Sequence, residues 1–437
     1  MDPTLLVLFG FLFVMLAIGV PVGFAIGGAT MLSLFFCTNQ SLIIVGQYNY
    51  SGIFSFTVMA IPFFMLAGTA MSTGGIAKKI VNFVSSLVGF ITGGLGAITI
   101  LACMFFGALC GSGMATTAAI GGMMIPQMKD KGYKVPYAAT LVCFGGTVGP
   151  IIPPSLSFVL YGATTKVPVP TLFLAGILPG ILIGIGFLVT NYVMCRSMGQ
   201  DLAIRTTAEK VNIMEAMQVR GKLVWKTFRE GFWALLSPVI ILGGIYSGIF
   251  TPTEAACISV VYSLFVSVFV YKELDMKGVY KTFLAASVIN GVTSFLLGYS
   301  TVFSTFMTFE RVPQAISEFL MTVTESPVVL LLIINAILLV VGCFLDTVPA
   351  IIVMAPMLLP TITHFGISPV HFGVIMAVNL AFGLCTPPYG CNLFVGAAVA
   401  KISMESMFKY IIPFFIVSIV LLMIITYVPA ISLFFIN

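Results

Sequence analysis

Apolar runs of about 20 residues recur from one end of the chain to the other, with short polar segments between them. A run of this length crosses the hydrocarbon core of a bilayer as a helix, because every backbone amide there must be satisfied within the segment. Charged residues form 8% of the 437 residues, whereas soluble domains carry about 25%. The sequence therefore predicts an all-α polytopic membrane protein and excludes a soluble catalytic domain.

The basic residues lie between the apolar runs and predict how the chain is threaded. If the N-terminus lies outside, all 19 Lys and Arg except Lys166 and Arg311 fall on the inner side, as the positive-inside rule requires. The same rule makes residues 93–128 an inner re-entrant hairpin and residues 326–364 an outer one, and it places both termini outside. Because topology accounts for the basic residues, the net charge of +5 does not indicate a nucleic acid partner.

The two halves of the chain share proline landmarks at a fixed interval. Pro153–Pro154 and Pro387–Pro388 lie 234 residues apart (153 to 387), and so do Pro179 and Pro413. The halves begin on opposite sides of the membrane, which predicts inverted repeats of the kind found in many secondary transporters. We assign the repeats to residues 1–195 and 231–437, and residues 196–230 to a cytoplasmic linker with an interfacial amphipathic helix.

Two broken spans lie at matching places in these halves. GGTVGPIIPPS (145–155) interrupts a span at about 136–163, and GLCTPPYGCN (383–392) interrupts one at about 370–400. Proline frees a backbone carbonyl, and such irregular backbone persists at membrane depth only where it is buried or lines a polar cavity. Freed carbonyls can coordinate a cation, and half-helix N-termini favour an anion. The alternative is a pair of proline kinks that only aid packing.

The predicted hairpin tips carry two residues that begin helices well. CGSGMATTAA (110–119) contains Ser112, and CFLDTVPA (343–350) contains Asp346, again 234 residues apart (112 to 346). Both residue types are good N-caps, and capping alone is the alternative to ligand binding. Asp346 is one of very few acidic residues at membrane depth, which indicates a functional role.

Other motifs predict structural roles. Thr251, Pro252 and Glu254 have the spacing of a capping box, and His364 and His371 are expected at the surface rather than in a proton relay. The nine cysteines include no CxxC pair, so we expect buried thiols and neither a disulfide nor a zinc site. No nucleophile–base pairing, HExxH or Walker motif occurs, which predicts no enzyme and no catalytic residue.

Several of these motifs together carry a family resemblance. IPFFMLAG, FGALCGSGMATTAAIGG, GGTVGPIIPPS, GGIYSGIFTPTEAA, FLDTVPAIIVMAPMLLP and GLCTPPYGCNLFVGAA resemble the large membrane subunit of TRAP transporters, the tripartite ATP-independent periplasmic transporters. The resemblance covers essentially the whole chain. It implies an elevator-type, sodium-driven importer of organic acids in the bacterial inner membrane. It also implies two partners, which are a small four-helix membrane subunit and a soluble periplasmic binding protein.

The resemblance also implies site residues. One sodium site would lie between the inner hairpin tip and the first break, partly through backbone carbonyls, at Cys110, Ser112, Gly149, Ile152 and Pro154. By the repeat, a second sodium site would involve Phe344, Asp346, Gly383, Thr386, Pro388 and Tyr389. The substrate would lie near Ser112, Ser155, Ser157, Asp346 and Asn392. The family more often has Ser where this chain has Cys110 and Gly113, so a ligand at those two positions would be a backbone carbonyl.

We therefore expect a sodium-coupled symporter for a small carboxylate such as sialic acid or a C4-dicarboxylate, with Na⁺ as coupling ion, no other metal and no cofactor. Half-helix N-termini, hydroxyls and sodium ions would hold the acid. The first residues, MDPTLLVLFGFLFVML, are expected to form a span rather than a cleaved signal peptide. Three alternatives stay open: a standalone sodium–anion symporter without a binding protein, a passive channel, and an intramembrane hydrolase that uses Ser112 and Asp346.

Overall fold

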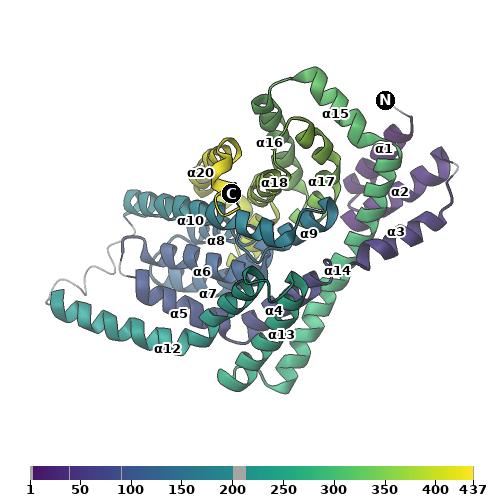
Figure 1. Ribbon diagram of the computed structural model, residues 1–437. Coiled ribbons are helices and arrows are strands. Elements are labelled where there is room, and N and C mark those ends of the chain that lie inside the picture. Colours follow the sequence, from purple (N-terminus) through teal and green to yellow (C-terminus); the bar gives the residue numbers. More distant parts are fainter. Residues whose placement is uncertain (1–2, 39, 90, 200–212, 437) are drawn as a thin grey trace.

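The computed structural model describes residues 3–38, 40–89, 91–199 and 213–436, and across these ranges it consists of helices and their connecting segments, with no strand (Figure 1). Within them, seven helices are long and apolar enough to cross a membrane, or up to eight if the bent pair α4–α5 counts as one span. The prediction of an all-α polytopic chain is thus confirmed.

In chain order the helices are α1 Pro3–Ala17, α2 Val22–Cys37, α3 Ile43–Ile53, α4 Ala60–Thr73, α5 Ile76–Val88, α6 Gly94–Cys110, α7 Gly113–Asp130, α8 Val135–Gly146, α9 Leu156–Thr165, α10 Val169–Met198, α12 Ile213–Tyr246, α13 Pro252–Phe265, the π-helix η1 Val266–Val270, α14 Met276–Phe309, α15 Val312–Val323, α16 Pro327–Phe344, α17 Thr347–His364, α18 Pro369–Gly383, α19 Cys391–Ala400, the 3-10 helix η2 Met404–Met407, α20 Phe408–Tyr427 and α21 Pro429–Leu433.

Two helix pairs occupy the segments where hairpins are predicted. Gly111, in the left-handed region with a φ of 63°, and Ser112 join α6 to α7. Leu345 and Asp346 join α16 to α17. The arms α6 and α7 pack on each other, whereas α16 packs mainly on α18, and α17 packs on α9, α14 and α15. The side of the membrane that each pair enters from stays a prediction.

The two broken spans are helix pairs of another kind. The first runs through α8, breaks after Gly146 and resumes with α9, which Ser155 caps. The second runs through α18, breaks after Gly383 and resumes with α19. Both Pro–Pro peptide bonds in these breaks are cis.

Glycines bring each hairpin into backbone contact with its neighbouring break. A Cβ atom added to Gly107 on α6 would lie 2.6 Å from the Cα atom of Gly149. A Cβ atom added to Gly383 would lie 2.5 Å from the carbonyl carbon of Gly342 on α16. Since real Cβ contacts are longer than this, glycine is required for both close approaches.

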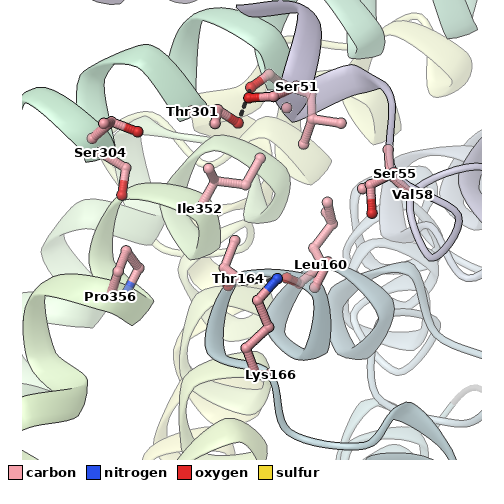
Figure 2. A pocket seen from close by; sticks show the side chains of 14 residues that line it. Ser51, Ser55, Val58, Leu160, Thr164, Lys166, Thr301, Ser304, Ile352 and Pro356 are labelled. Carbon is pink, nitrogen blue, oxygen red and sulfur yellow. Dashed lines mark hydrogen bonds between the residues drawn. The ribbon is translucent and has the colours of Figure 1, made fainter. Parts of the chain in front are cut away.

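The buried apolar side chains gather in three groups, one mainly from α8–α10 with α16–α20, one from α4–α7 with α12 and α13, and one from α1–α3 with α14. Where the first group meets the third, a cavity of about 230 Å³ lies between α3 and α14 on one side and α9 and α17 on the other (Figure 2). We call it the seam cavity; its lining includes Ser55, Lys166, Ser304, Thr305, Ile352 and Pro356.

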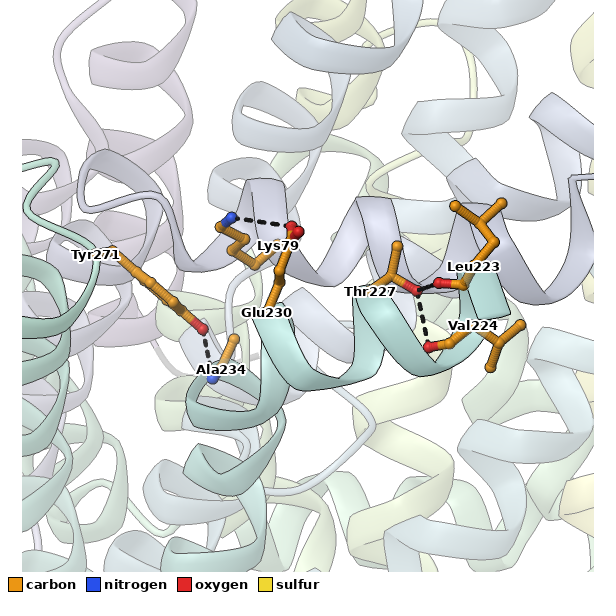
Figure 3. Close-up of polar contacts among 7 residues, drawn as sticks. All are labelled: Lys79, Leu223, Val224, Thr227, Glu230, Ala234 and Tyr271. Atoms are coloured by element: carbon orange, nitrogen blue, oxygen red, sulfur yellow. Dashed lines mark hydrogen bonds and ion pairs between the residues drawn. The ribbon is translucent and has the colours of Figure 1, made fainter. Parts of the chain in front are cut away.

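Polar contacts attach α12 to α5 and to the segment after η1 (Figure 3). The Lys79 amine lies 3.4 Å from a carboxylate oxygen of Glu230, and the backbone amide of Ala234 donates to the Tyr271 hydroxyl at 3.0 Å. Part of the predicted linker, residues 200–212, lies outside the described residues, as do the side chains of 213–220. The amphipathic cytoplasmic linker therefore stays a prediction.

The predicted capping box is confirmed, and most of the cysteines are buried as expected. The Glu254 carboxylate accepts from the Thr251 amide at 2.8 Å, and the Thr251 hydroxyl accepts from the Glu254 amide at 3.3 Å, which completes the capping box. Six of the nine cysteines are buried, and Cys37, Cys257 and Cys391 are half-buried.

His364 is exposed as expected, but the prediction of a surface side chain is wrong for His371. Its ring is 2% exposed, and its nitrogens lie 3.1 Å from the Ser432 hydroxyl and 3.1 Å from the Thr426 carbonyl oxygen. Helices α20 and α21 both pack on α18, the first helix of the second broken span. They therefore cover the His371 side chain, which lies near the start of α18.

Candidate ion and substrate site

The first hairpin tip is built around the backbone of Ser112. Its side chain caps α7 by accepting from the Ala115 amide at 3.4 Å, as predicted for an N-cap. Its carbonyl oxygen accepts from the Thr116 hydroxyl at 2.7 Å, and the Cys110 sulfur lies 3.1 Å from the same hydroxyl. Thr116 donates its one proton to Ser112, so its oxygen can accept from the Cys110 thiol and has one further lone pair for a cation.

This tip lies directly against the first break. A Cβ atom on Gly149 would lie 3.2 Å from the Ser112 carbonyl oxygen and 3.1 Å from the Thr116 hydroxyl. A Cβ atom on Gly111 would lie 3.1 Å from the carbonyl oxygen of Pro154. The structure thus brings the tip residues and the break residues of the first predicted set together, and it adds Thr116.

Ile152 belongs to that set only through its backbone. Its side chain points toward α10, where a Cβ atom on Gly180 would lie 2.4 Å from the Ile152 Cγ1 atom. The isoleucine side chain therefore fills space against α10 and offers no ligand atom.

The second hairpin tip is attached to the second break in a similar way. Asp346 caps α17, with one carboxylate oxygen accepting from the Thr347 amide at 2.7 Å. The Cys343 thiol donates to the Thr386 carbonyl oxygen at 3.1 Å, and the Gly390 amide donates to the Cys343 carbonyl oxygen at 3.1 Å. The second carboxylate oxygen of Asp346 makes no hydrogen bond with a described residue, which leaves it free to bind an ion or a donor.

Three further members of the second set lie at the surface of this region, whereas Gly383 is buried and Thr386 is half-buried. The Phe344 and Tyr389 rings are stacked, with centroids 6.5 Å apart, and the two residues are 55% and 48% exposed. Pro388 is also exposed. The hydroxyl of Thr386 donates to the Phe382 carbonyl oxygen at 3.0 Å, which leaves its oxygen as an acceptor.

Asn392 joins the second break to the first broken span. Its side-chain amide donates to the Cys143 carbonyl oxygen at 3.3 Å, and the Cys143 thiol donates back to the Asn392 carbonyl oxygen at 3.1 Å. A Cβ atom on Gly113 would lie 3.2 Å from the same side-chain nitrogen. Asn392 therefore lies where the first tip, α8 and the start of α19 meet.

Two buried oxygen atoms in this region, the side-chain oxygen of Asn392 and the hydroxyl of Thr117, have no hydrogen-bond partner among the described residues. Thr117 lies against the end of α8, since a Cβ atom on Gly146 would come within 2.1 Å of its hydroxyl. A buried polar atom without a partner is costly, and these two oxygens are available as ligands. Oxygen acceptors are the ligands that hard cations such as sodium take, so these residues fit a sodium ion.

Ser155 and Ser157 are buried, at 0% and 1% exposure. The Ser155 hydroxyl donates to the Pro150 carbonyl oxygen and accepts from the Phe158 amide at 3.4 Å. In this conformation Ser155 therefore caps α9 and stabilises the loop of the break, and both serines are covered by the surrounding helices.

The electrostatics of the region come from helix ends. The helices α7, α9, α17 and α19 all begin at a tip or a break. Each helix N-terminus carries a partial positive charge, which favours an anion close to it. None of the described groups that make the contacts above is a lysine or arginine. The arrangement can therefore hold an oxyanion with helix N-termini and a cation with freed oxygens.

Sequence comparisons identify relatives along almost the whole chain. The model of the family described as "Tripartite ATP-independent periplasmic transporter, DctM component" matches residues 9–431. The chain is 39% identical to the isethionate TRAP transporter permease protein DctMQ of Oleidesulfovibrio alaskensis, over 99% of this chain and 66% of that protein. It is 40% identical to the C4-dicarboxylate TRAP transporter large permease protein DctM of Pseudomonas aeruginosa, over 86% of each chain.

A further relative and a solved structure extend this result. The chain is 34% identical to the sialic acid TRAP transporter large permease protein SiaM of Vibrio cholerae, over 98% of this chain and 96% of that protein. The crystal structure of the Alcanivorax borkumensis YdaH transporter superposes with a TM-score of 0.62 over 98% of both chains, at 14% identity, and so shares the fold. With a family match over residues 9–431 and relatives 34% to 40% identical, this chain belongs to the DctM family of TRAP transporter large permeases, which are transport proteins rather than enzymes.

Proposed function

We propose that this chain imports a small organic acid by sodium-coupled secondary transport, as the large membrane subunit of a TRAP transporter. The observation that carries the proposal is the pairing of two hairpin tips with two broken helices, together with buried oxygens that lack partners beside the first tip. Relatives named for C4-dicarboxylates, isethionate and sialic acid all carry acids, which supports an acid as the substrate.

The first sodium ion is assigned to the first tip and break. The Thr116 hydroxyl oxygen and the Gly149 backbone lie there against Ser112, whose carbonyl oxygen already accepts from the Thr116 amide and hydroxyl, and the Pro154 carbonyl oxygen lies beside Gly111. Cys110 supports this set through its sulfur, which lies 3.6 Å from the Ser112 carbonyl oxygen. Freed carbonyls at a break in a membrane helix are the usual sodium ligands in transporters of this design.

The second sodium ion is assigned to the second tip and break. Asp346 supplies a carboxylate there, and Thr386 and the backbone from Gly383 to Tyr389 supply further oxygens. The acid is placed between the tips, near Asn392 and Ser112, where helix N-termini replace a lysine or arginine as the partner of the carboxylate. Ser155 and Ser157 would contribute only in a conformation that uncovers them.

Two partners and a cell compartment complete the proposal. A small four-helix membrane subunit would enlarge the scaffold, and a soluble periplasmic binding protein would deliver the acid. The protein would lie in the bacterial inner membrane with both termini in the periplasm. The hairpins and broken helices would move as one elevator-type body relative to α1–α3 and α12–α14, and they would form two inverted repeats.

Uptake into proteoliposomes tests the proposal. The chain, reconstituted with its co-encoded small subunit and binding protein, should accumulate one acid from a panel of succinate, isethionate and sialic acid only under an inward sodium gradient. Uptake that is unchanged without sodium would overturn the coupling. Full uptake without any binding protein would favour a standalone symporter, and the absence of uphill accumulation would favour a channel.

A further inference from the structure

The seam cavity lies outside the proposed ion sites and has a charge pattern of its own. In Figure 2 the amine of Lys166 extends past Thr164 into the cavity, with Ser55 and Ser304 on either side. The lining contains no acidic residue and no basic residue other than Lys166. The cavity therefore presents one positive charge among hydroxyl and apolar groups.

The hydrogen-bond donors of the cavity fall into two kinds. Ser51, Thr164 and Thr301 already donate to backbone carbonyl oxygens. The hydroxyls of Ser55, Ser304 and Thr305, in contrast, make no hydrogen bond with any described residue. The same holds for the amine of Lys166, which takes part in no salt bridge within the described ranges.

Free donors around a single cation match the chemistry of a carboxylate. An ionised carboxylate only accepts hydrogen bonds, and charge-assisted bonds to an ammonium are about twice as strong as neutral ones. The cavity of about 230 Å³ is smaller than the roughly 300–1,000 Å³ of sites for drug-sized ligands. It therefore suits a small acid.

The cavity is also connected to the proposed substrate site by two helices. At 1.5 Å per residue, Leu160 lies about 8 Å along α9 from Ser155, and Ile352 lies about 9 Å along α17 from Asp346. Leu160 and Ile352 both line the cavity. The helices that leave the first break and the second tip therefore lead directly to it.

We propose that the seam cavity is a second anion site, which holds the carboxylate of the incoming acid before the acid reaches the hairpin tips. The inference rests on the proposed transport function. The walls of the cavity come from α3 and α14, which belong to the scaffold of the proposed function, and from α9 and α17, which belong to its moving body. A movement of α9 and α17 relative to α3 and α14 would break the contact between α14 and α17 and take the site apart. The acid would then leave Lys166 for the helix N-termini at the tips.

Protection of the Lys166 amine from acylation tests the site directly. The full chain in lipid nanodiscs is treated with sulfo-NHS-acetate in the presence of succinate, isethionate or sialic acid, or of sodium chloride at equal ionic strength. The acylated peptides are then quantified by mass spectrometry.

Lys401 is the matched control, because it ends α19 in the same left-handed conformation (φ 55°, against 64° at Lys166) and does not line the cavity. At least one acid should slow acylation of Lys166 about threefold and leave Lys401 unchanged, because contacts between exposed charges are weak. Equal rates at Lys166 in every solution, or equal slowing at both lysines, would overturn the proposal.

Uptake kinetics give a second readout. Lys166→Gln and Thr305→Val should raise the KM for uptake roughly three- to fivefold and leave the maximal rate unchanged, because they weaken capture and not translocation. Thr308→Val is the control, since Thr308 lies one turn further along α14, is exposed, and donates to the Ser304 carbonyl oxygen at 2.9 Å. An unchanged KM in both cavity variants contradicts the second anion site. Wild-type uptake that is independent of sodium contradicts the proposed function instead, and the acylation result is unaffected by it.

Discussion

The breaks at 145–155 and 383–392 occupy matching places in the sequence, yet their surroundings differ. Every residue of the first break is buried except Ile152, which is half-buried, whereas Pro388 and Tyr389 in the second break are exposed. The arms of the first hairpin pack on each other, and those of the second pack on other helices. The same local chemistry is therefore enclosed in one half and partly exposed in the other.

The largest expected effect comes from the backbone contact at the second break. Gly383→Ala places a methyl group 2.5 Å from the Gly342 carbonyl carbon, and overpacking of this kind costs about 1–3 kcal/mol or more. We expect a lower thermal unfolding midpoint of the purified protein and loss of uptake. Gly149→Ala should cost less, because its nearest neighbour is the Thr116 hydroxyl at 3.1 Å.

Gly122→Ala is the control for both glycine variants, since nothing lies within 4 Å of a Cβ atom at Gly122 on α7. It should leave the unfolding midpoint unchanged or raise it slightly, because alanine favours a helix. A greater loss of stability in Gly149→Ala than in Gly383→Ala would contradict the comparison between the two breaks.

The next effect separates the two tips. Asp346→Asn keeps a good N-cap and removes the charge, so stability should stay close to that of the wild type. We expect the sodium concentration for half-maximal uptake to rise about tenfold, equal to about 1.4 kcal/mol. Ser112→Ala, in contrast, removes a cap and should cost about 1 kcal/mol of stability. If Asp346→Asn keeps both uptake and sodium dependence, then Asp346 is only a cap.

A third variant tests the enclosed first break. Thr117→Val removes a buried hydroxyl that has no partner, so it should not destabilise the protein. If this hydroxyl binds sodium, the half-maximal sodium concentration should rise about threefold to tenfold, as for loss of a contact worth about 1 kcal/mol. Thr140→Val is the control, because Thr140 is equally buried but bonds to the Pro136 carbonyl oxygen. Identical sodium curves for wild type and Thr117→Val would exclude this hydroxyl as a ligand.

The smallest effect concerns the exposed ring pair. Tyr389→Ala removes the stacking on Phe344, and aromatic pairs contribute about 0.5–1.5 kcal/mol, least where the rings are exposed. We expect a small fall in the unfolding midpoint and uptake within about twofold of the wild type. A much larger fall in uptake would show that the partly exposed second break depends on this ring.

Helix ends were predictable from the sequence because capping involves few neighbouring residues. Ser112, Thr251 and Asp346 begin α7, α13 and α17, and each accepts a hydrogen bond from a backbone amide in the first turn. The prolines likewise indicated where the two spans break. These features depend on local chemistry, which a short stretch of sequence contains in full.

Partners across helices were not predictable in this way. Thr116 and Thr117 are neighbours in one helical turn. Thr116 bonds to Ser112, whereas the Thr117 hydroxyl has no partner among the described residues, and the surrounding sequence does not distinguish the two. His371 is buried because α20 and α21 cover it. The sequence did contain a signal for this burial, because His371 lies 234 residues after Tyr137 (137 to 371) and so occupies the matching place in the second half. Tyr137 is buried too, and its hydroxyl donates to Asn191 on α10, the last helix of the first half before the linker, at 2.8 Å.

The contacts of Gly107 with Gly149 and of Gly342 with Gly383 bear on how this transporter can be redesigned. Because each hairpin is held against its break by main-chain atoms, these positions offer no side chain that could be exchanged to alter specificity. The side chains at the tips and at the seam cavity are not part of those contacts. Libraries restricted to such side chains should therefore leave the contacts between hairpins and breaks intact while they test the proposed acid sites.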